Sequence, residues 1–228
     1  MAKKGDLCFC SWSGGKDSCL ALFRALGSGL RPTVLLTMLT ETGERSRSHG
    51  LPVTLLKEQA ERLGMRLVTV CTSWDDYEKN FLNAARRLRE EGISAGIFGD
   101  IDLEQHREWV ERVCAKEGME ALLPLWKSSR DDLLAELQSS GFKAVIVSVK
   151  NGVLDSGFLG KTLDAEIIEE MKIAGIDASG EEGEYHTFVT DGPIFSRPVD
   201  FSRGHVHLRD GYHFLDMDTL ETEHVMRG

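Results

Sequence analysis

The chain lacks any long hydrophobic run. Its 228 residues are 41% hydrophobic and 28% charged, an ordinary balance for a globular protein. No apolar stretch approaches the roughly 20 residues that are needed to cross a bilayer. The basic N-terminal segment 1–10 contains only a short apolar run, which meets a glycine loop at once. We therefore expect neither a membrane span nor a signal peptide, and we predict a cytoplasmic protein.

Paired cysteines are also missing. The five cysteines are an odd number and lie among apolar neighbours, at positions 8, 10, 19, 71 and 114. Cys8 and Cys10 form a C-x-C pair, but no second pair follows at the spacing that zinc sites require. The pattern predicts reduced thiols buried in the core of a cytosolic protein.

An excess of positive charge is absent as well. The net charge is −10, whereas a protein that holds nucleic acid through its phosphates usually presents a basic field. The local cluster Arg86, Arg87 and Arg89 reads as the solvated face of a helix. We therefore expect no direct contact with nucleic acid.

What the sequence does contain is an alternation of strands and helices through its first 150 residues. Apolar runs rich in β-formers alternate with amphipathic stretches. Strands are expected at 7–12, 33–39, 66–71, 95–98 and 144–149, and helices lie between them, among them 17–26 and 75–91. The pattern predicts an α/β fold with a doubly wound parallel five-stranded sheet and helices on both faces.

The pattern changes after Asn151. One helix is expected near 163–174, followed by a loop rich in Gly and Glu and by short strands such as 185–189 and 205–217. This composition predicts a smaller α+β part packed on the first. The expected domains are residues 1–152 and 153–228.

The most informative stretch joins the first strand to the first helix. A Walker A loop would need a glycine where Cys10 stands and a hydroxyl residue where Asp17 stands, so that motif is excluded. The residues that are present are Ser13, Gly14, Gly15, Lys16, Asp17 and Ser18.

This loop predicts a phosphate site. Its N–H groups and the positive end of the helix favour anions, and the two glycines let the backbone curl around a phosphate. The two serines can donate hydrogen bonds, and Lys16 supplies a mobile positive charge. Asp17 would repel bare phosphate, so its presence suggests a bridging Mg²⁺. A simple strand–turn–helix junction is the alternative.

The hexapeptide resembles the pyrophosphate loop of the ATP pyrophosphatase family, which has the adenine nucleotide α-hydrolase-like (HUP-type) fold. The resemblance implies cleavage of ATP to AMP and pyrophosphate, and a sheet in the order 3-2-1-4-5. In that order the loop faces Gly99 and Asp100 across the crevice where such sheets bind ligands. Asp100 would then be a second Mg²⁺ or phosphate-side residue, and a plain strand-end turn is the alternative.

A second motif is "GEEGEYHTFVTDGP", residues 180–193. A solvated acidic loop would account for its glutamates but not for the Tyr-His-Thr-Phe run. The motif resembles the C-terminal signature of the diphthine–ammonia ligase (diphthamide synthase) family. The segments 98–114 and 124–126 are similar to that family's middle segment, so the resemblance runs from about residue 7 to 200.

The resemblance implies an ATP-dependent amide ligase. It would adenylate the carboxylate of diphthine on translation elongation factor 2, and ammonia would then displace AMP to give diphthamide. The implied cofactors are ATP and Mg²⁺, with Asp17 and Asp100 as metal ligands. The partners would be the elongation factor and ammonium, and a homodimer is left open as the oligomeric state.

The resemblance also implies roles for single residues. Catalytic roles fall to Lys16, Asp17, Glu184 and His186, and substrate binding to Glu181, Glu182, Glu184, Tyr185, His186 and Thr187. We expect Tyr185 and the glutamates to receive the trimethylammonium group of diphthine. His186 would either accept a proton from ammonium or position the loop.

Two other functions share the loop. A related ATP pyrophosphatase would act on a different acceptor in a bacterium, where diphthine is absent. A non-catalytic protein would bind adenine nucleotide without turnover. A tRNA thiolase is disfavoured by the net charge of −10 and the scattered cysteines.

Overall fold

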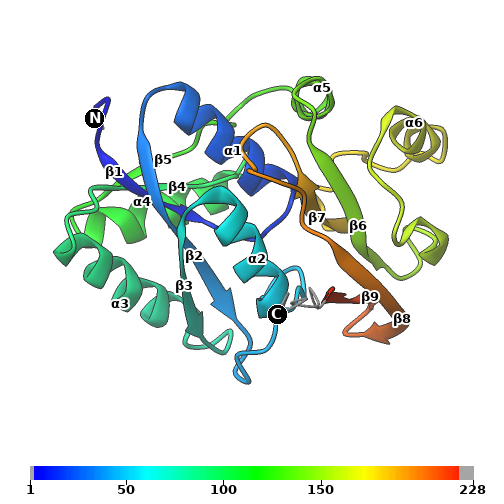
Figure 1. The fold of residues 1–228 in the computed structure, drawn as a ribbon, viewed down its shortest axis with the longest axis horizontal. Coiled ribbons are helices and arrows are strands. Elements are labelled where there is room, and N and C mark those ends of the chain that lie inside the picture. Colours follow the sequence, from blue (N-terminus) through cyan, green and yellow to red (C-terminus); the bar gives the residue numbers. More distant parts are fainter. Residues whose placement is uncertain (1–2, 221–228) are drawn as a thin grey trace, which may run out of the picture.

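The computed structural model describes residues 3–220. Its first sheet has five parallel strands in the order β3-β2-β1-β4-β5 (Figure 1). These strands are β1 (Leu7–Ser11), β2 (Arg31–Leu39), β3 (Arg66–Cys71), β4 (Ala95–Ile97) and β5 (Glu120–Leu122). The predicted order 3-2-1-4-5 is therefore confirmed. β1 lies at the centre of the sheet, between β2 and β4.

Helices cover both faces of this sheet because its strands are apolar on both sides. Cys8 and Cys10 of β1 pack with α1 (Lys16–Gly27) and α2 (Val53–Leu63), whereas Phe9 packs with α3 (Tyr77–Glu90) and α4 (Glu104–Lys116). Alternate residues of one strand thus enter two different cores. Residue 64, which follows α2, is a left-handed glycine that caps the helix.

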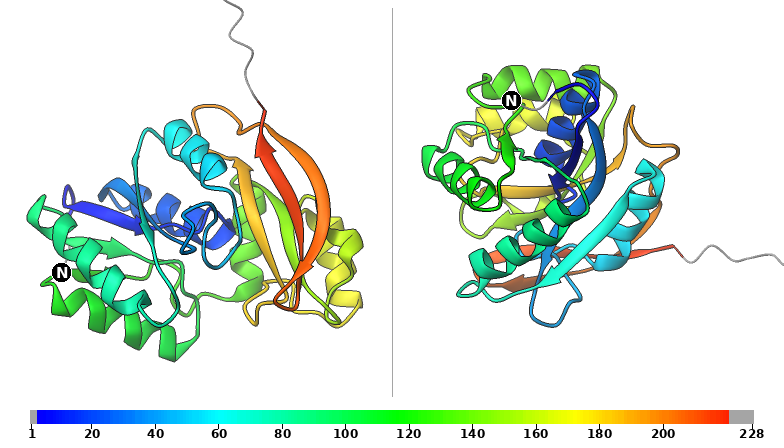
Figure 2. Two further views of the ribbon diagram at one scale, coloured as in Figure 1. Left: turned by 90° about the horizontal axis from the view of Figure 1, so that it is seen from below. Right: turned by 90° about the vertical axis from the view of Figure 1, so that its left-hand side faces the viewer.

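The second sheet is antiparallel, with the order β7-β6-β9-β8 (Figure 2). Its strands are β6 (Lys143–Lys150), β7 (Tyr185–Asp191), β8 (Phe201–Arg209) and β9 (Tyr212–Thr219). The helices α5 (Arg130–Ser139), η1 (Ser156–Phe158) and α6 (Ala165–Ile173) belong to the same half of the chain. The expected helix near 163–174 and the expected C-terminal strands are therefore present.

The prediction that residues 144–149 complete the parallel sheet is wrong. That strand is β6, which pairs antiparallel with β7 and β9, and the fifth parallel strand is the short β5. The run "AVIVSV" is buried on both faces in its actual position, as any central strand would be. Its hydrophobic pattern therefore could not tell one sheet from the other. The domain ranges 1–152 and 153–228 stay a prediction, and their residues 1–2 and 221–228 lie outside the described part.

One cysteine differs from expectation. Cys8, Cys10, Cys19 and Cys114 are buried, but Cys71 at the end of the edge strand β3 is exposed. Burial raises the pKa of the Cys8 thiol to about 11 and that of Cys114 to about 12. Within residues 3–220 no helix is long and apolar enough to cross a membrane.

The two sheets meet at the loop that follows β1. The backbone N–H of Val189 in β7 donates to the carbonyl of Gly14 at 2.9 Å. The N–H of Lys16 donates to the Thr187 hydroxyl at 3.0 Å. Two motifs that are about 170 residues apart in the sequence are thereby brought together by direct hydrogen bonds.

Candidate active site

A cavity of about 470 Å³ lies at the carboxyl ends of the parallel strands. Loops after β1, β2, β3 and β4 form one side, and the loop before β7 forms the other. This is the position at which a doubly wound sheet binds its ligands. The predicted residues that line the cavity are Ser13, Asp17, Ser18, Gly99, Asp100, Glu181 and His186.

Gly14 lies behind the cavity wall, in left-handed backbone with φ of +80°. A Cβ atom there would lie 2.8 Å from Gln59 Oε1 and 2.9 Å from Leu56 Cδ2. The Gln59 amide donates to the carbonyls of Gly14 (3.0 Å) and Val189 (2.7 Å), and its oxygen accepts from the Trp12 indole. Glycine is therefore required both by the backbone conformation and by the close packing of α2.

The absence of a side chain at Gly15 leaves room for the ring of His49, a residue that was not predicted to belong to the site. A Cβ atom at Gly15 would lie 2.5 Å from His49 Cε1 and 3.0 Å from the Thr187 carbonyl. The loop is further tied by the Ser18 hydroxyl, which donates to the Gly15 carbonyl and lies 3.1 Å from the Ser13 hydroxyl.

The loop after β4 approaches the start of α1 in the same way. A Cβ atom at Gly99 would lie 2.9 Å from the backbone carbon of Asp17. Asp100, next in the chain, lines the cavity together with Asp17. The expected juxtaposition of the two segments is thus present.

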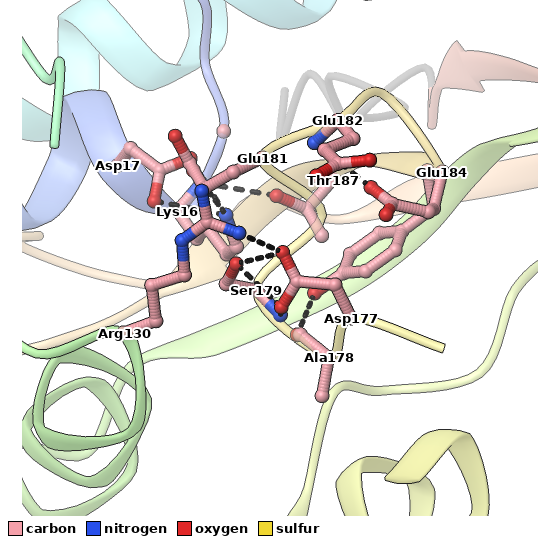
Figure 3. Close-up of polar contacts among 12 residues, drawn as sticks. Lys16, Asp17, Arg130, Asp177, Ala178, Ser179, Glu181, Glu182, Glu184 and Thr187 are labelled. Carbon is pink, nitrogen blue, oxygen red and sulfur yellow. Dashed lines mark hydrogen bonds and ion pairs between the residues drawn. The ribbon is translucent and has the colours of Figure 1, made fainter. Parts of the chain in front are cut away.

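Lys16 lies beneath the cavity, where its ammonium group is enclosed by opposite charge (Figure 3). Its Nζ donates to both carboxylate oxygens of Asp17, at 2.9 and 2.7 Å, and lies 3.8 Å from Glu181 Oε1. The same atom lies 5.9 Å from the ring centroid of Tyr185. Lys16 thus connects loop 13–18 to the C-terminal motif.

Glu181 is the acidic residue of the second motif that reaches the cavity. Burial and the nearby charge of Asp17 raise its pKa to about 7. Arg130 is bound by Asp177 at 2.6 Å (Figure 3) and by Asp102 at 2.8 Å. The Ser179 hydroxyl also donates to Asp177, so the loop that carries Glu181 is tied to α5.

The other predicted substrate residues mostly point into the protein. Glu184 is buried and accepts from the N–H of Glu182, whose own side chain is exposed. Tyr185 is 2% exposed, and its hydroxyl donates to the Ala178 carbonyl at 2.6 Å. The expected cation–π contact with a substrate is therefore not open to Tyr185, because its ring is buried and already faces Lys16. Thr187 is buried against the start of α1.

His186 stacks on His49, with ring centroids 4.5 Å apart, and also on Tyr212 of the β8–β9 hairpin at 5.9 Å. His49 Nδ1 lies 3.1 Å from the Thr187 carbonyl oxygen. Burial lowers the pKa of His186 to about 3 and that of His49 to about 4, and the charge of Lys16 adds to both effects. Both rings are therefore neutral at physiological pH.

The carboxylates of Asp17 and Asp100 are oxygen donors of the type that Mg²⁺ prefers. No group of three potential metal-ligating side chains occurs in the part of the chain that the structure describes. Asp17 and Asp100 both line the cavity, so their carboxylates could hold a Mg²⁺ ion that would take its remaining ligands from phosphate and water. His106 Nδ1 lies 3.2 Å from Asp100, and this hydrogen bond raises the pKa of His106.

The part of the cavity wall formed by the loops after β2 and β3 and by the start of α3 was not predicted from the sequence. It comprises Ser46, Arg47, Ser48, His49, Trp74 and Tyr77. Trp74 is 63% exposed and stacks on Tyr77, and the Arg47 guanidinium lies 4.9 Å from its ring centroid. The segment 40–52 has no regular hydrophobic period, so the available signal was only its place after a buried strand.

Both halves of the chain are similar to known protein domains. Residues 8–121 match the model of the diphthamide synthase N-terminal domain, and residues 129–219 match that of the C-terminal domain. A diphthine–ammonia ligase from Homo sapiens is 31% identical, over 88% of this chain and 85% of its own length. One from Danio rerio is 27% identical, over 92% of this chain and 94% of its own.

Among solved structures, a predicted subunit of tRNA methyltransferase from Methanocaldococcus jannaschii aligns with a TM-score of 0.45 and 18% identity. The alignment covers 82% of this chain and 98% of that one. The two domain models together span most of the chain, in the same order as the two sheets. The chain belongs to the diphthamide synthase family.

Proposed function

We propose that the protein is an ATP-dependent carbon–nitrogen ligase of the cytoplasm. It adenylates the carboxylate of diphthine on translation elongation factor 2, and ammonia displaces AMP to give diphthamide. The observation that carries the proposal is the convergence of loop 13–18 and motif 180–187 on one cavity. We assign ATP binding to residues 1–152 and recognition of the protein substrate to residues 153–228.

ATP enters with its phosphates against the loop of Ser13, Gly14, Gly15, Lys16, Asp17 and Ser18. The hydroxyls of Ser13 and Ser18 line the cavity, and Gly99 keeps the opposite loop close. Asp17 and Asp100 would hold Mg²⁺, which would supply positive charge to neutralise the phosphates. Lys16 does not line the cavity; its role is to hold the Asp17 carboxylate in place.

Adenylation is needed because a carboxylate oxygen is a poor leaving group. Joining it to AMP makes it a good one, so ammonia can attack the acyl carbon. Most of the catalysis then comes from positioning and from neutralising charge on the departing pyrophosphate. Glu184 acts by fixing the loop backbone, because it accepts the N–H of Glu182 from inside the protein.

The test is AMP formation with ATP, Mg²⁺, ammonium and elongation factor 2 that carries diphthine. We expect AMP only when the factor is present. Asp17→Asn keeps the shape of the side chain and should lower the rate about 100-fold or more. Asp210→Asn is the matched control, because Asp210 lies in the exposed β8–β9 turn with φ of +49°, a conformation that asparagine tolerates. Absence of AMP with the wild-type chain, or equal AMP without the factor, contradicts the proposal.

A further inference from the structure

The stacked pair of His49 and His186 has no role in the ATP binding proposed above. Both rings line the cavity, and their centroids are 4.5 Å apart. Gly15 lacks a side chain where His49 packs, so the His49 ring lies directly against the phosphate loop. His49 therefore lies against the residues assigned to ATP, and His186 belongs to the motif assigned to the acceptor.

The hydrogen bond of His49 defines its tautomer. A carbonyl oxygen can only accept, so Nδ1, which lies 3.1 Å from the Thr187 carbonyl, carries the proton. Nε2 of a neutral ring then has a free lone pair. This nitrogen is an acceptor for an N–H group.

The surroundings keep the pair neutral. Burial is the main cause of the lowered pKa values, about 4 for His49 and about 3 for His186. The positive charge of Lys16 on α1 lowers both values further, whereas Asp17 opposes this effect at His186. Glu181 from the preceding loop lines the same cavity, and Tyr212 of β9 covers the other side of His186. An ammonium ion brought here would meet the same desolvation and the same repulsion from Lys16, opposed by the attraction of Asp17.

We propose that His49 and His186 form the binding site for the nitrogen substrate, which they hold as neutral ammonia through N–H bonds to unprotonated ring nitrogens. This inference rests on the proposed ligase function and names the group that positions its second substrate. Ammonia held in this way keeps its own lone pair free for attack. Ammonium loses its extra proton to water as it enters.

The bonding changes balance as follows. The ammonia lone pair forms the C–N bond at the acyl carbon of the adenylate. The C–O bond to AMP breaks, and its electron pair goes to the phosphate oxygen of AMP. The nitrogen of the adduct then releases one proton to water, which leaves the neutral amide.

The decisive experiment compares two substitutions of one residue. His49→Asn keeps an N–H donor near the Nδ1 position but removes the acceptor, whereas His49→Gln can place an amide oxygen near the Nε2 position. We expect His49→Asn to raise the KM for ammonia about 10-fold or more. His49→Gln should restore much of this loss. Exchange of pyrophosphate into ATP, measured without ammonia, should remain within about twofold for both variants.

His213→Gln is the matched control, because His213 lies outside the cavity and contacts Asn151. It should leave both assays unchanged. If His49→Asn lowers exchange and amide formation equally, His49 only supports the fold and the inference fails. If the wild-type chain forms no AMP with the diphthine-bearing factor, the proposed function fails as well.

A second measurement uses the wild-type chain alone. The fraction of total ammonium that is present as ammonia rises about tenfold per pH unit below the ammonium pKa. The KM expressed as total ammonium should therefore fall about tenfold from pH 7 to pH 8. A KM that is constant over this range would mean that ammonium itself binds, and would overturn the inference.

Discussion

The two walls of the cavity are built in different ways. Loop 13–18 is held by backbone hydrogen bonds and by close packing at its glycines, and three of its side chains line the cavity. Motif 180–187 is held by buried charge: Glu184 and Tyr185 point inward, and Glu181 lies near Lys16 and Asp17. We call the first the rigid wall because close packing fixes its backbone, and the second the ionisable wall because it contains Glu181, whose pKa is raised to about 7.

This difference suits the two substrates that we propose for these walls. Phosphates are bound best by groups that need no rearrangement, which packed backbone provides. The acceptor carboxylate has to lose charge during the reaction, and a wall with ionisable groups close to their pKa can respond to that change. Lys16 belongs to both walls, since it is part of the loop and pairs with Asp17 and Glu181.

Gln59 connects the two walls by hydrogen bonds, and we expect its substitution to have the largest effect on stability. Gln59→Leu removes the donor to the carbonyls of Gly14 and Val189 and the acceptor of the Trp12 indole. Because Gln59 is fully buried, these groups lose their partners without gaining water. We expect a loss of about 3 kcal/mol in the free energy of unfolding, measured by urea denaturation.

The control for this change is Gln138→Leu on α5. The Gln138 side-chain nitrogen is buried and has no hydrogen-bond partner within residues 3–220. Its replacement should leave the free energy of unfolding unchanged or slightly raised. Equal losses in the two variants would show that the Gln59 bonds do not hold the walls together.

Gly14 tests the rigid wall with a smaller expected effect. Gly14→Ala adds a Cβ at φ of +80°, within 3.0 Å of three side-chain atoms of α2 and its preceding loop. Gly211→Ala adds one at φ of +81°, with nothing within 4 Å. Both variants carry the backbone strain, so the difference between them, about 2 kcal/mol, isolates the packing clash. Urea denaturation of both variants measures it, and equal losses would remove the packing argument.

The rigid wall was also the more predictable one. Its six residues are contiguous and stand between a recognisable strand and helix, so the sequence alone indicated a phosphate site. His49 and Gln59 could not be predicted, because their partners lie up to 138 residues away and no periodic pattern links them. For Tyr185 the segment was identified correctly but the direction of its side chain was not, because a motif does not show which of its side chains face the cavity. Strand β6 was placed in the wrong sheet for a similar reason, since its uniform burial fits either one.

The ionisable groups of the second wall should make the free energy of unfolding depend on pH. The pKa of Glu181 is raised to about 7 in the folded protein, so the folded state binds its proton more tightly than the unfolded chain. Stability from this group therefore falls as pH rises from about 4.5 to 7. The pKa values of His49 and His186 are lowered, to about 4 and about 3, so their contribution rises with pH up to about 6.5.

These opposite slopes partly cancel in the wild-type chain, and Glu181→Gln separates them. We expect its free energy of unfolding to rise more steeply than that of the wild type between pH 4.5 and 6.5, and to exceed it by about 1 kcal/mol at pH 8. Glu182→Gln is the control, because the Glu182 side chain is exposed. Urea denaturation at several pH values measures both variants. Parallel curves for Glu181→Gln and the wild type would mean that Glu181 is ionised as readily in the folded protein as in the unfolded chain, and that the second wall, like the first, is held without any contribution from its protonation.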